Sequence, residues 1–362
     1  MADLMSATHT YEKLKKTYKD FFAPAAKFTV GGKDIFQLKG IRILSVEAVL
    51  SIRETGSVRV IVGNCYDYKN GTFFSEIKEL LVLGKEVELS LGYASSLQKI
   101  FKGYLAATGM IFDGEDGISL ELTALDVRRL MMSDNFHIRE HKITNYSDAV
   151  RDIMKRYQKL CKVKIEDTSE KMKEGQIYQH NSDYDFIVRD LIESGLVDRE
   201  FFIVADTAYF RKPKSVSAPL ITLSVGRGIL RFARFAEYEN QKIQVVGFDH
   251  AAGNAVTGQA QAKASDSMVD VLGAPGERIV TNAECAGSAQ AENQAKALAG
   301  RLLAKRQRAE ASCIGLPEII PGRFIKLERV DSLMNQKYYI TKVVHTCGSE
   351  GFRTDFWMEG WE

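Results

Sequence analysis

The sequence predicts a β-rich α+β protein in which two antiparallel β-barrels flank a helical insert. Two long stretches, 28–130 and 214–362, carry apolar residues at every second position between turns rich in glycine and aspartate. This spacing is typical of strands with one buried face that are joined by short turns. The stretch between them, 131–213, repeats its apolar residues every three or four positions, as helices do. Residues 1–27 precede this pattern as a separate extension.

The bulk composition limits the classes of function. A chain of 362 residues can form two or three domains, and 49 Lys and Arg against 47 Asp and Glu leave a net charge of +2. This balance predicts no nucleic-acid site, which would need a basic face. The five cysteines lie far apart without a CxxC pair, so we expect free thiols rather than disulfides or zinc. The sequence contains no run of eighteen apolar residues, so no membrane span is predicted.

The N-terminal extension predicts an amphipathic helix that ends before Pro24. Its sequence YEKLKKTYKDFF spaces large apolar residues by three and four positions, with lysines between them. Such a helix either covers the core of its own chain or docks on a partner. We expect the second role, with an interface formed by Tyr11, Leu14, Tyr18, Phe21 and Phe22.

The first barrel is expected over 28–130. Residues 46–52, 87–91 and 118–122 each carry apolar side chains at every second position, and the turn DGEDG occupies 113–117.

The insert contains a cluster of polar residues that could be mistaken for an active site. The stretch QIYQHNSDYDFIVRDLIESG places His180, Asp183 and Asp185 around Ser182, ahead of an apolar run. Serine is a favoured N-cap, an acid three residues later can complete a capping box, and the first helical turn favours negative charge. The cluster therefore predicts the start of a helix.

A second candidate for chemistry is HIREH at 137–141, which matches the H-x-x-E-H zinc pattern through His137, Glu140 and His141. Its flanking residues alternate as in a strand, and no third ligand is clearly placed. A metal-dependent hydrolase stays an alternative. The glycine-rich SVGRG at 224–228 precedes another strand rather than a helix, so it predicts a turn. We expect no catalytic residue, no metal and no cofactor.

The second barrel is expected over 214–362, beginning with strands in LITLSV, ILRFARF and KIQVVGF. The small, polar residues that follow predict a loop over 253–282, and an alanine-rich stretch predicts a helix over 283–308. Three closing strands are expected in RFIKLERV, KYYITKVVHTC and FRTDFWMEG.

This order of elements resembles the phage late-control protein D family, which includes the baseplate hub of contractile phage tails and the N-terminal hub part of VgrG proteins. The similar strings are LVLGKEVELSLGY with FKGYLAATG at 81–109, IYQHNSDYDFIVRDLIESG, AENQAKALAGRLLAKRQRAEASCIGLPEIIPGRFIKL, and YYITKVVHTC with its His345. Together they cover about 28–362 of the sequence.

The resemblance implies a structural baseplate hub of a phage tail or contractile injection system, and not an enzyme. Its family forms homotrimers whose two barrels per chain make a pseudo-sixfold ring between a sixfold inner tube and a threefold spike. The implied partners are an inner tube or tube-initiator protein and other baseplate proteins. Such a protein is made in the bacterial cytoplasm and joins an assembled tail or extracellular particle.

The sequence ends soon after its final strand pattern, so a separate spike protein is expected, with Trp361 contributing to that contact. A receptor-binding module is the second alternative, and it would lack affinity for a tube protein.

Overall fold

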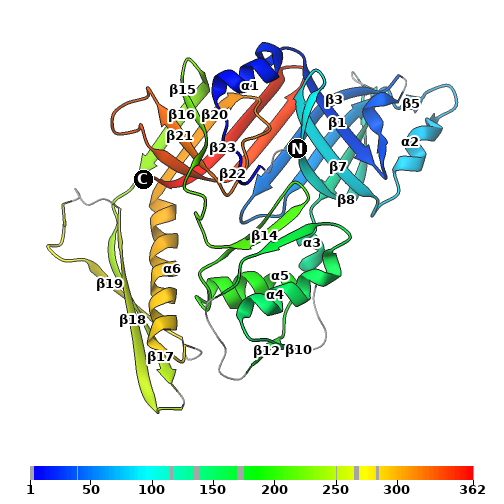
Figure 1. Cartoon of the computed structure of the whole chain (residues 1–362). Helices are drawn as coiled ribbons and strands as arrows, with labels where there is room; N and C mark the ends of the chain where they lie inside the picture. The colour runs from blue at the N-terminus through cyan, green and yellow to red at the C-terminus, as the bar shows by residue number, and fades with distance from the viewer. Residues whose placement is uncertain are drawn as a thin grey trace.

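The computed structural model describes residues 4–38, 40–114, 117–133, 138–168, 175–249, 251–264, 269–282 and 285–361, with Trp361 described by its backbone only. Two β-barrels lie side by side, with a mixed α/β insert below them and an arm of strands and one helix at the side (Figure 1). The β-rich fold class predicted from the alternating pattern is confirmed.

Barrel 1 forms the N-terminal half of this pair. Within the described residues its strands pair in the order β1-β7-β8-β9-β4-β3, all antiparallel. Alternation explains its core, because Val46 and Ala48 face Val60 and Val58 across the β3–β4 ladder and all four are buried. The strands are β1 (Pro24–Val30), β3 (Arg42–Ser51), β4 (Ser57–Gly63), β7 (Glu86–Tyr93), β8 (Ser96–Asp113) and β9 (Gly117–Leu125).

Short elements surround the outer end of barrel 1. They are β2 (Lys33–Asp34), the 3₁₀ turn η2 (Ile35–Gln37), β5 (Tyr66–Asp67), β6 (Thr72–Phe73) and α2 (Ser75–Leu80).

Barrel 2 closes on itself, because β22 pairs with both β21 and β23 around the order β22-β21-β15-β16-β20-β23. The expected antiparallel arrangement needs one correction: β15 runs parallel to β21 and to the first residues of β16. No hairpin joins β15 to β21, so no turn imposes the antiparallel direction on that pair. The strands are β15 (Pro219–Val225), β16 (Gly228–Ala236), β20 (Gln307–Ile314), β21 (Phe324–Glu328), β22 (Lys337–Gly348) and β23 (Gly351–Trp361).

The two barrels repeat one strand order. Each barrel has six main strands, which are numbered one to six along the chain. In both barrels neighbouring strands pair in the order 1-4-5-6-3-2. Bulges fall at matching places, between the second and third strands and between the fifth and sixth. Only the first strand differs in direction. The structure therefore shows a repeated topology that sequence similarity between the halves does not reveal.

A strand pairing joins the barrels into one sheet. Residues 342–348 of β22 pair antiparallel with residues 45–51 of β3. A single apolar core continues through both barrels, as expected for two units that share a ladder.

The insert follows β9 and packs around its own apolar core. Arg128 anchors its start: this buried guanidinium pairs with Asp126 at 2.7 Å and donates to the Ser51 carbonyl of β3 at 2.8 Å. The elements are α3 (Arg128–Met131), β10 (Arg139–Lys142), α4 (Tyr146–Met154), η3 (Lys155–Tyr157), β11 (Lys162–Ile165), β12 (Gln176–Gln179), α5 (Asp183–Asp185), the π-helical η4 (Phe186–Glu193), β13 (Glu200–Val204) and β14 (Thr207–Arg211).

The arm leaves barrel 2 between β16 and β20 and consists of β17 (Asn240–Asp249), β18 (Asn254–Lys263), β19 (Gly276–Thr281) and α6 (Ser288–Arg306). This corrects the loop predicted over 253–282, since β18 and β19 lie within it. The small residues that suggested a loop instead let α6 lie close to the sheet: a Cβ at Gly258 would stand 2.1 Å from the Glu292 nitrogen. Composition alone does not separate a flexible spacer from a strand packed tightly under a helix.

Candidate assembly surfaces

The residues of HIREH do not form a metal site within the described part of the chain. Residues 139–142 form β10, and His141 is buried with its Nδ1 3.2 Å from Asp152 and its Nε2 2.9 Å from Gln179. Both ring nitrogens therefore have protein partners. Glu140 and His141 are consecutive in a strand and point to opposite faces of the ladder. His137 lies outside the described residues.

No group of three or more His, Cys, Asp or Glu side chains is placed to hold a metal among the residues that the structure describes. All five cysteines are buried free thiols.

The cluster around Ser182 begins a helix, as predicted. The Ser182 hydroxyl accepts from the Asp185 backbone N–H at 3.1 Å and donates to its carboxylate at 2.8 Å. The cap differs from the expected capping box, because the Asp185 carboxylate binds the serine hydroxyl instead of the N-cap backbone N–H. His180 is exposed beside it.

Asp183 has a structural role that the sequence did not reveal. It is buried, and its carboxylate accepts from the Tyr157 hydroxyl at 2.6 Å, from Gln179 at 2.7 Å and from Arg156 at 2.5 Å. These donors come from η3 and β12, so Asp183 ties three segments of the insert together. Burial and this carboxylate raise the pKa of Tyr157.

The N-terminal helix α1 (Tyr11–Thr17) packs on its own chain. Leu14 and Tyr18 are buried, and the Tyr18 hydroxyl donates to the buried Glu318 carboxylate at 2.5 Å. Burial raises the pKa of Glu318. The Phe21 ring stands 5.5 Å from that of Tyr93 in β7.

Only some of the five residues expected to contact a partner are therefore accessible in the single chain. Leu14 and Tyr18 are covered by barrel residues and present no surface to a partner, and Tyr11 and Phe21 are half-buried against the same core. Phe22 is 80% exposed, and its contact with a partner stays a prediction. Trp361 pairs with Tyr338 through its backbone, so its side-chain contact with a spike also stays a prediction.

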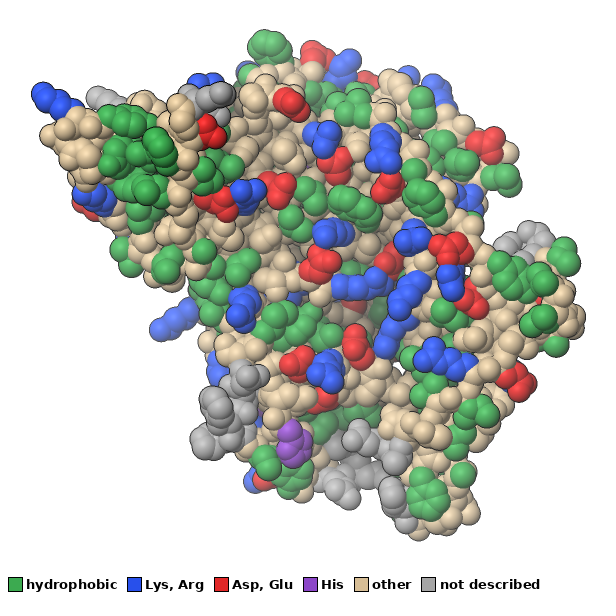
Figure 2. Space-filling view, turned by 180° about the vertical axis from the view of Figure 1, so that it is seen from behind, with side chains coloured by type: hydrophobic (Ala, Val, Ile, Leu, Met, Phe, Trp, Pro, Cys, Tyr) green, Lys and Arg blue, Asp and Glu red, His purple; other side chains and the backbone are tan. Residues whose placement is uncertain are grey.

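Other exposed apolar residues lie at positions that the sequence did not single out. At the outer end of barrel 1 the β8–β9 hairpin exposes Met110 by 60% and Phe112 by 70%, with Ile111 and Tyr68 exposed beside them. The Tyr68 hydroxyl accepts from the Ile118 N–H at 2.7 Å and so holds β5–β6 against this hairpin. Figure 2 shows hydrophobic side chains gathered at this end of the molecule, at its upper left.

Barrel 2 and the arm carry further exposed apolar residues. On barrel 2 these are Val225, Leu230 and Phe235, of β15 and β16, and on the arm Val269, Val271 and Leu272 precede β19. Charges of both signs are mixed over the face drawn in Figure 2.

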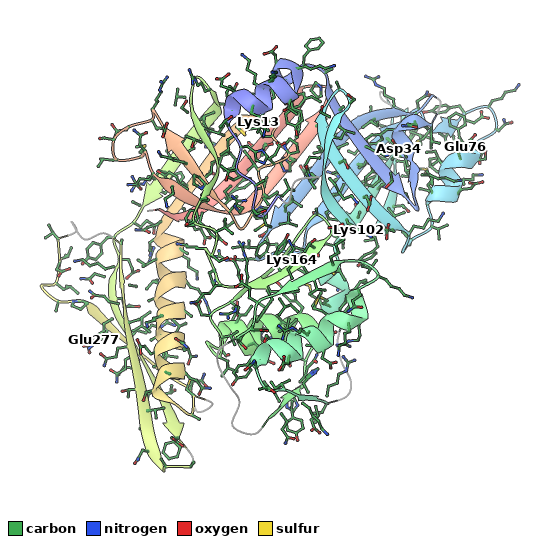
Figure 3. The ribbon with its side chains drawn as sticks, in the orientation of Figure 1. Lys13, Asp34, Glu76, Lys102, Lys164 and Glu277 are labelled. Carbon is green, nitrogen blue, oxygen red and sulfur yellow. The ribbon has the colours of Figure 1, made fainter. Side chains whose placement is uncertain are left out.

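The insert is fixed to barrel 1 by backbone hydrogen bonds. The Lys102 N–H of β8 donates to the Ala205 carbonyl at 3.1 Å, and the Ala205 N–H donates to the Ile100 carbonyl at 3.2 Å. Lys102 lies at this junction, while Asp34 and Glu76 mark the outer end of the same barrel (Figure 3). The insert thus holds the first half of β8 and leaves the second half projecting.

A protein family described as the Alg8 N-terminal domain matches residues 25–349. The chain belongs to the Alg8 N-terminal domain family. No curated protein matches this chain. None of the helices in the described ranges is long and apolar enough to cross a membrane.

Solved structures share the fold of this chain. The 43 kDa tail protein of prophage MuSo2 from Shewanella oneidensis superimposes with a TM-score of 0.68 at 13% identity, over 93% of this chain and 98% of the other. A tail protein from Neisseria meningitidis MC58 gives 0.69 at 12% identity, over 94% and 97%.

The E. coli c3393 protein, a type VI secretion system component, gives a TM-score of 0.56 at 12% identity, over 93% of this chain and 77% of the other. The expected likeness to tail and type VI proteins is confirmed at the level of the fold. Membership of the late-control protein D family stays a prediction.

Proposed function

We propose that this protein is a structural baseplate subunit, a hub that links a sixfold inner tube to a threefold spike in a phage tail or contractile injection system. The observation that carries the proposal is the pair of barrels with one strand order, joined edge to edge within one chain. Three such chains would present six similar barrels in a ring and keep threefold symmetry overall. The shared fold with tail proteins supports the same role.

The proposed partners are a tube or tube-initiator protein, a separate spike and other baseplate proteins, and the proposed place of work is an assembled tail or an extracellular particle. Exposed apolar residues at the barrel 1 end, on β16 and on the arm offer enough separate surfaces for several contacts. Synthesis in the bacterial cytoplasm is part of the same proposal.

The proposed role requires no catalysis. The hydrolase alternative needs HIREH to bind zinc, but His141 already uses both ring nitrogens in hydrogen bonds inside the insert. The receptor-binding alternative has no observation that favours it over a hub.

The proposal predicts a homotrimer. Native mass spectrometry of the purified 40.5 kDa chain over a range of concentrations should show a species of three chains that increases with concentration. Electron microscopy of that species should show a ring of six barrels. A chain that stays monomeric at the highest concentrations would rule the hub out.

A further inference from the structure

The strands β8 and β22 are equivalent, since each is the fifth strand of its barrel, yet they differ in their neighbours. Each pairs with the fourth strand only through its N-terminal part. After a bulge, each then forms a ladder of seven consecutive pairs with the sixth strand, through residues 107–113 in β8 and 342–348 in β22. The outer side of 342–348 pairs with β3. The outer side of 107–113 pairs with no strand in the described part of the chain.

The strands β3 and β16 form a second equivalent pair. Each is the second strand of its barrel, and each bulges from the third strand at a leucine, Leu44 or Leu230. The outer side of β3 pairs with β22. The outer side of β16 meets β15 only at Gly228 and Ile229, so residues 230–236 are a second edge without a strand among the described residues.

These two edges cannot meet within one chain. The β8–β9 hairpin ends at the outer end of barrel 1, and β16 lies on the outer side of barrel 2 (Figure 1). A contact between two different surfaces of identical chains is head-to-tail, and it closes into a ring when the rotation permits. Unpaired strand edges are also the surfaces on which another strand adds most readily.

We propose that residues 107–113 of β8 in one copy pair antiparallel with β16 of the next copy, reproducing between chains the junction that β22 and β3 form within each chain. The occupant of the β8 edge is thus a second copy of this chain. This inference rests on the proposed hub function and specifies the contact that builds its ring.

The bulges set the register of the proposed contact. When the β8–β9 bulge is aligned with the β22–β23 bulge that precedes Lys342, Asp113 is equivalent to Gly348. When the bulge of β16 is aligned with that of β3, Arg231 is equivalent to Ser45. Because Gly348 faces Ser45 within the chain, Asp113 would face Arg231 of the next copy.

The same register places Phe112 opposite Phe232 and Gly109 opposite Phe235. Opposite charges, paired aromatic rings and an aromatic ring over a glycine are all favourable neighbours across two strands. The side chains that this backbone register pairs are therefore chemically compatible.

Burial supports the same contact. The β22 residues equivalent to Met110 and Phe112 are His345 and Cys347, and both are buried where the barrels join. Met110 and Phe112 are exposed in the single chain. The proposed pairing would cover them in the way that the internal junction covers their counterparts.

Cysteine cross-linking tests both the contact and its register. Ile111→Cys with Ala233→Cys places two thiols directly opposite each other, where antiparallel Cα atoms stand about 4.5–5.5 Å apart, a separation that a disulfide accepts. Mild oxidation should give a covalent species of three chains on a denaturing gel, reversed by a reductant. The five native cysteines are buried and should not contribute.

The matched control is Ile111→Cys with Arg234→Cys, in which the second thiol points to the other face of the strand and the cross-link should be lost. Native mass spectrometry of each variant before oxidation separates the possible outcomes. Trimers without a cross-link from the first pair, or with one only from the control pair, would overturn the inference and leave the hub standing. Monomers throughout would overturn both.

Discussion

His345 is the residue whose protonation is most strongly opposed by the fold. It is fully buried, its Nδ1 lies 2.9 Å from the Thr354 hydroxyl, and burial lowers its pKa to about 4. In the unfolded chain a histidine has a pKa of about 6.5. Between these values the unfolded chain binds a proton that the folded chain does not, so stability falls as the pH falls.

We therefore predict that His345 makes the protein about 2 kcal/mol less stable at pH 5 than at pH 7. Denaturant unfolding at both values should show this difference, and His345→Asn should lack it even if the variant is less stable at both. Glu318 acts in the opposite direction, because its pKa is raised and its burial costs more as the pH rises. An equal pH dependence in variant and parent would show that another group titrates.

At the scale of elements, α1 behaves as a part of the barrel. Its attachment combines the buried Leu14 with the hydrogen bond from Tyr18 to Glu318. Tyr18→Phe keeps the ring and removes the hydroxyl, so the buried Glu318 carboxylate loses its hydrogen-bond donor. We expect the free energy of unfolding to fall by roughly 1–3 kcal/mol.

Amide hydrogen exchange of α1 would measure this loss locally, and thermal unfolding would measure it globally. Tyr11→Phe is the control, since the Tyr11 ring also packs on the core but its hydroxyl makes no hydrogen bond within the described residues. If exchange in α1 is the same in both variants, the Glu318 contact does not hold the helix.

For the assembled molecule, trimer formation should depend on the two proposed strand edges, in β8 and β16, more than on other exposed apolar residues. Phe112→Asp places a charge on the proposed β8 edge opposite an aromatic ring, so we predict that the trimer dissociates at concentrations where the parent is assembled. The fold of each chain should persist, because the side chain is largely exposed in the single chain.

Ile138→Asp provides the comparison, because Ile138 is 66% exposed on the insert, away from both barrel edges. Sedimentation or native mass spectrometry should find trimer for this variant and monomer for Phe112→Asp, with matching circular dichroism. Equal assembly of the two variants would place the contact elsewhere.

Features that depend on neighbours a few positions apart could be predicted from the sequence. Alternating residues specify strands such as β3 because one face of a strand is buried. Ser182 specifies the start of a helix because a cap needs only the next three residues. The five scattered cysteines indicated free thiols, and the structure describes all five as buried thiols.

Which strands meet and which edges remain open depends on contacts between residues far apart in the chain. β3 pairs with β22 from the other end of the chain, and no local pattern records that contact. Local sequence patterns also do not show that β15 runs parallel to β21 or that β18 lies under α6. The same holds for Asp183, whose carboxylate accepts hydrogen bonds from two other elements. The exposed half of β8 reads like any other strand, because a period of two reports a buried face but not whether an edge has a neighbour. The candidate assembly surfaces are therefore a property of how the strands are arranged in space.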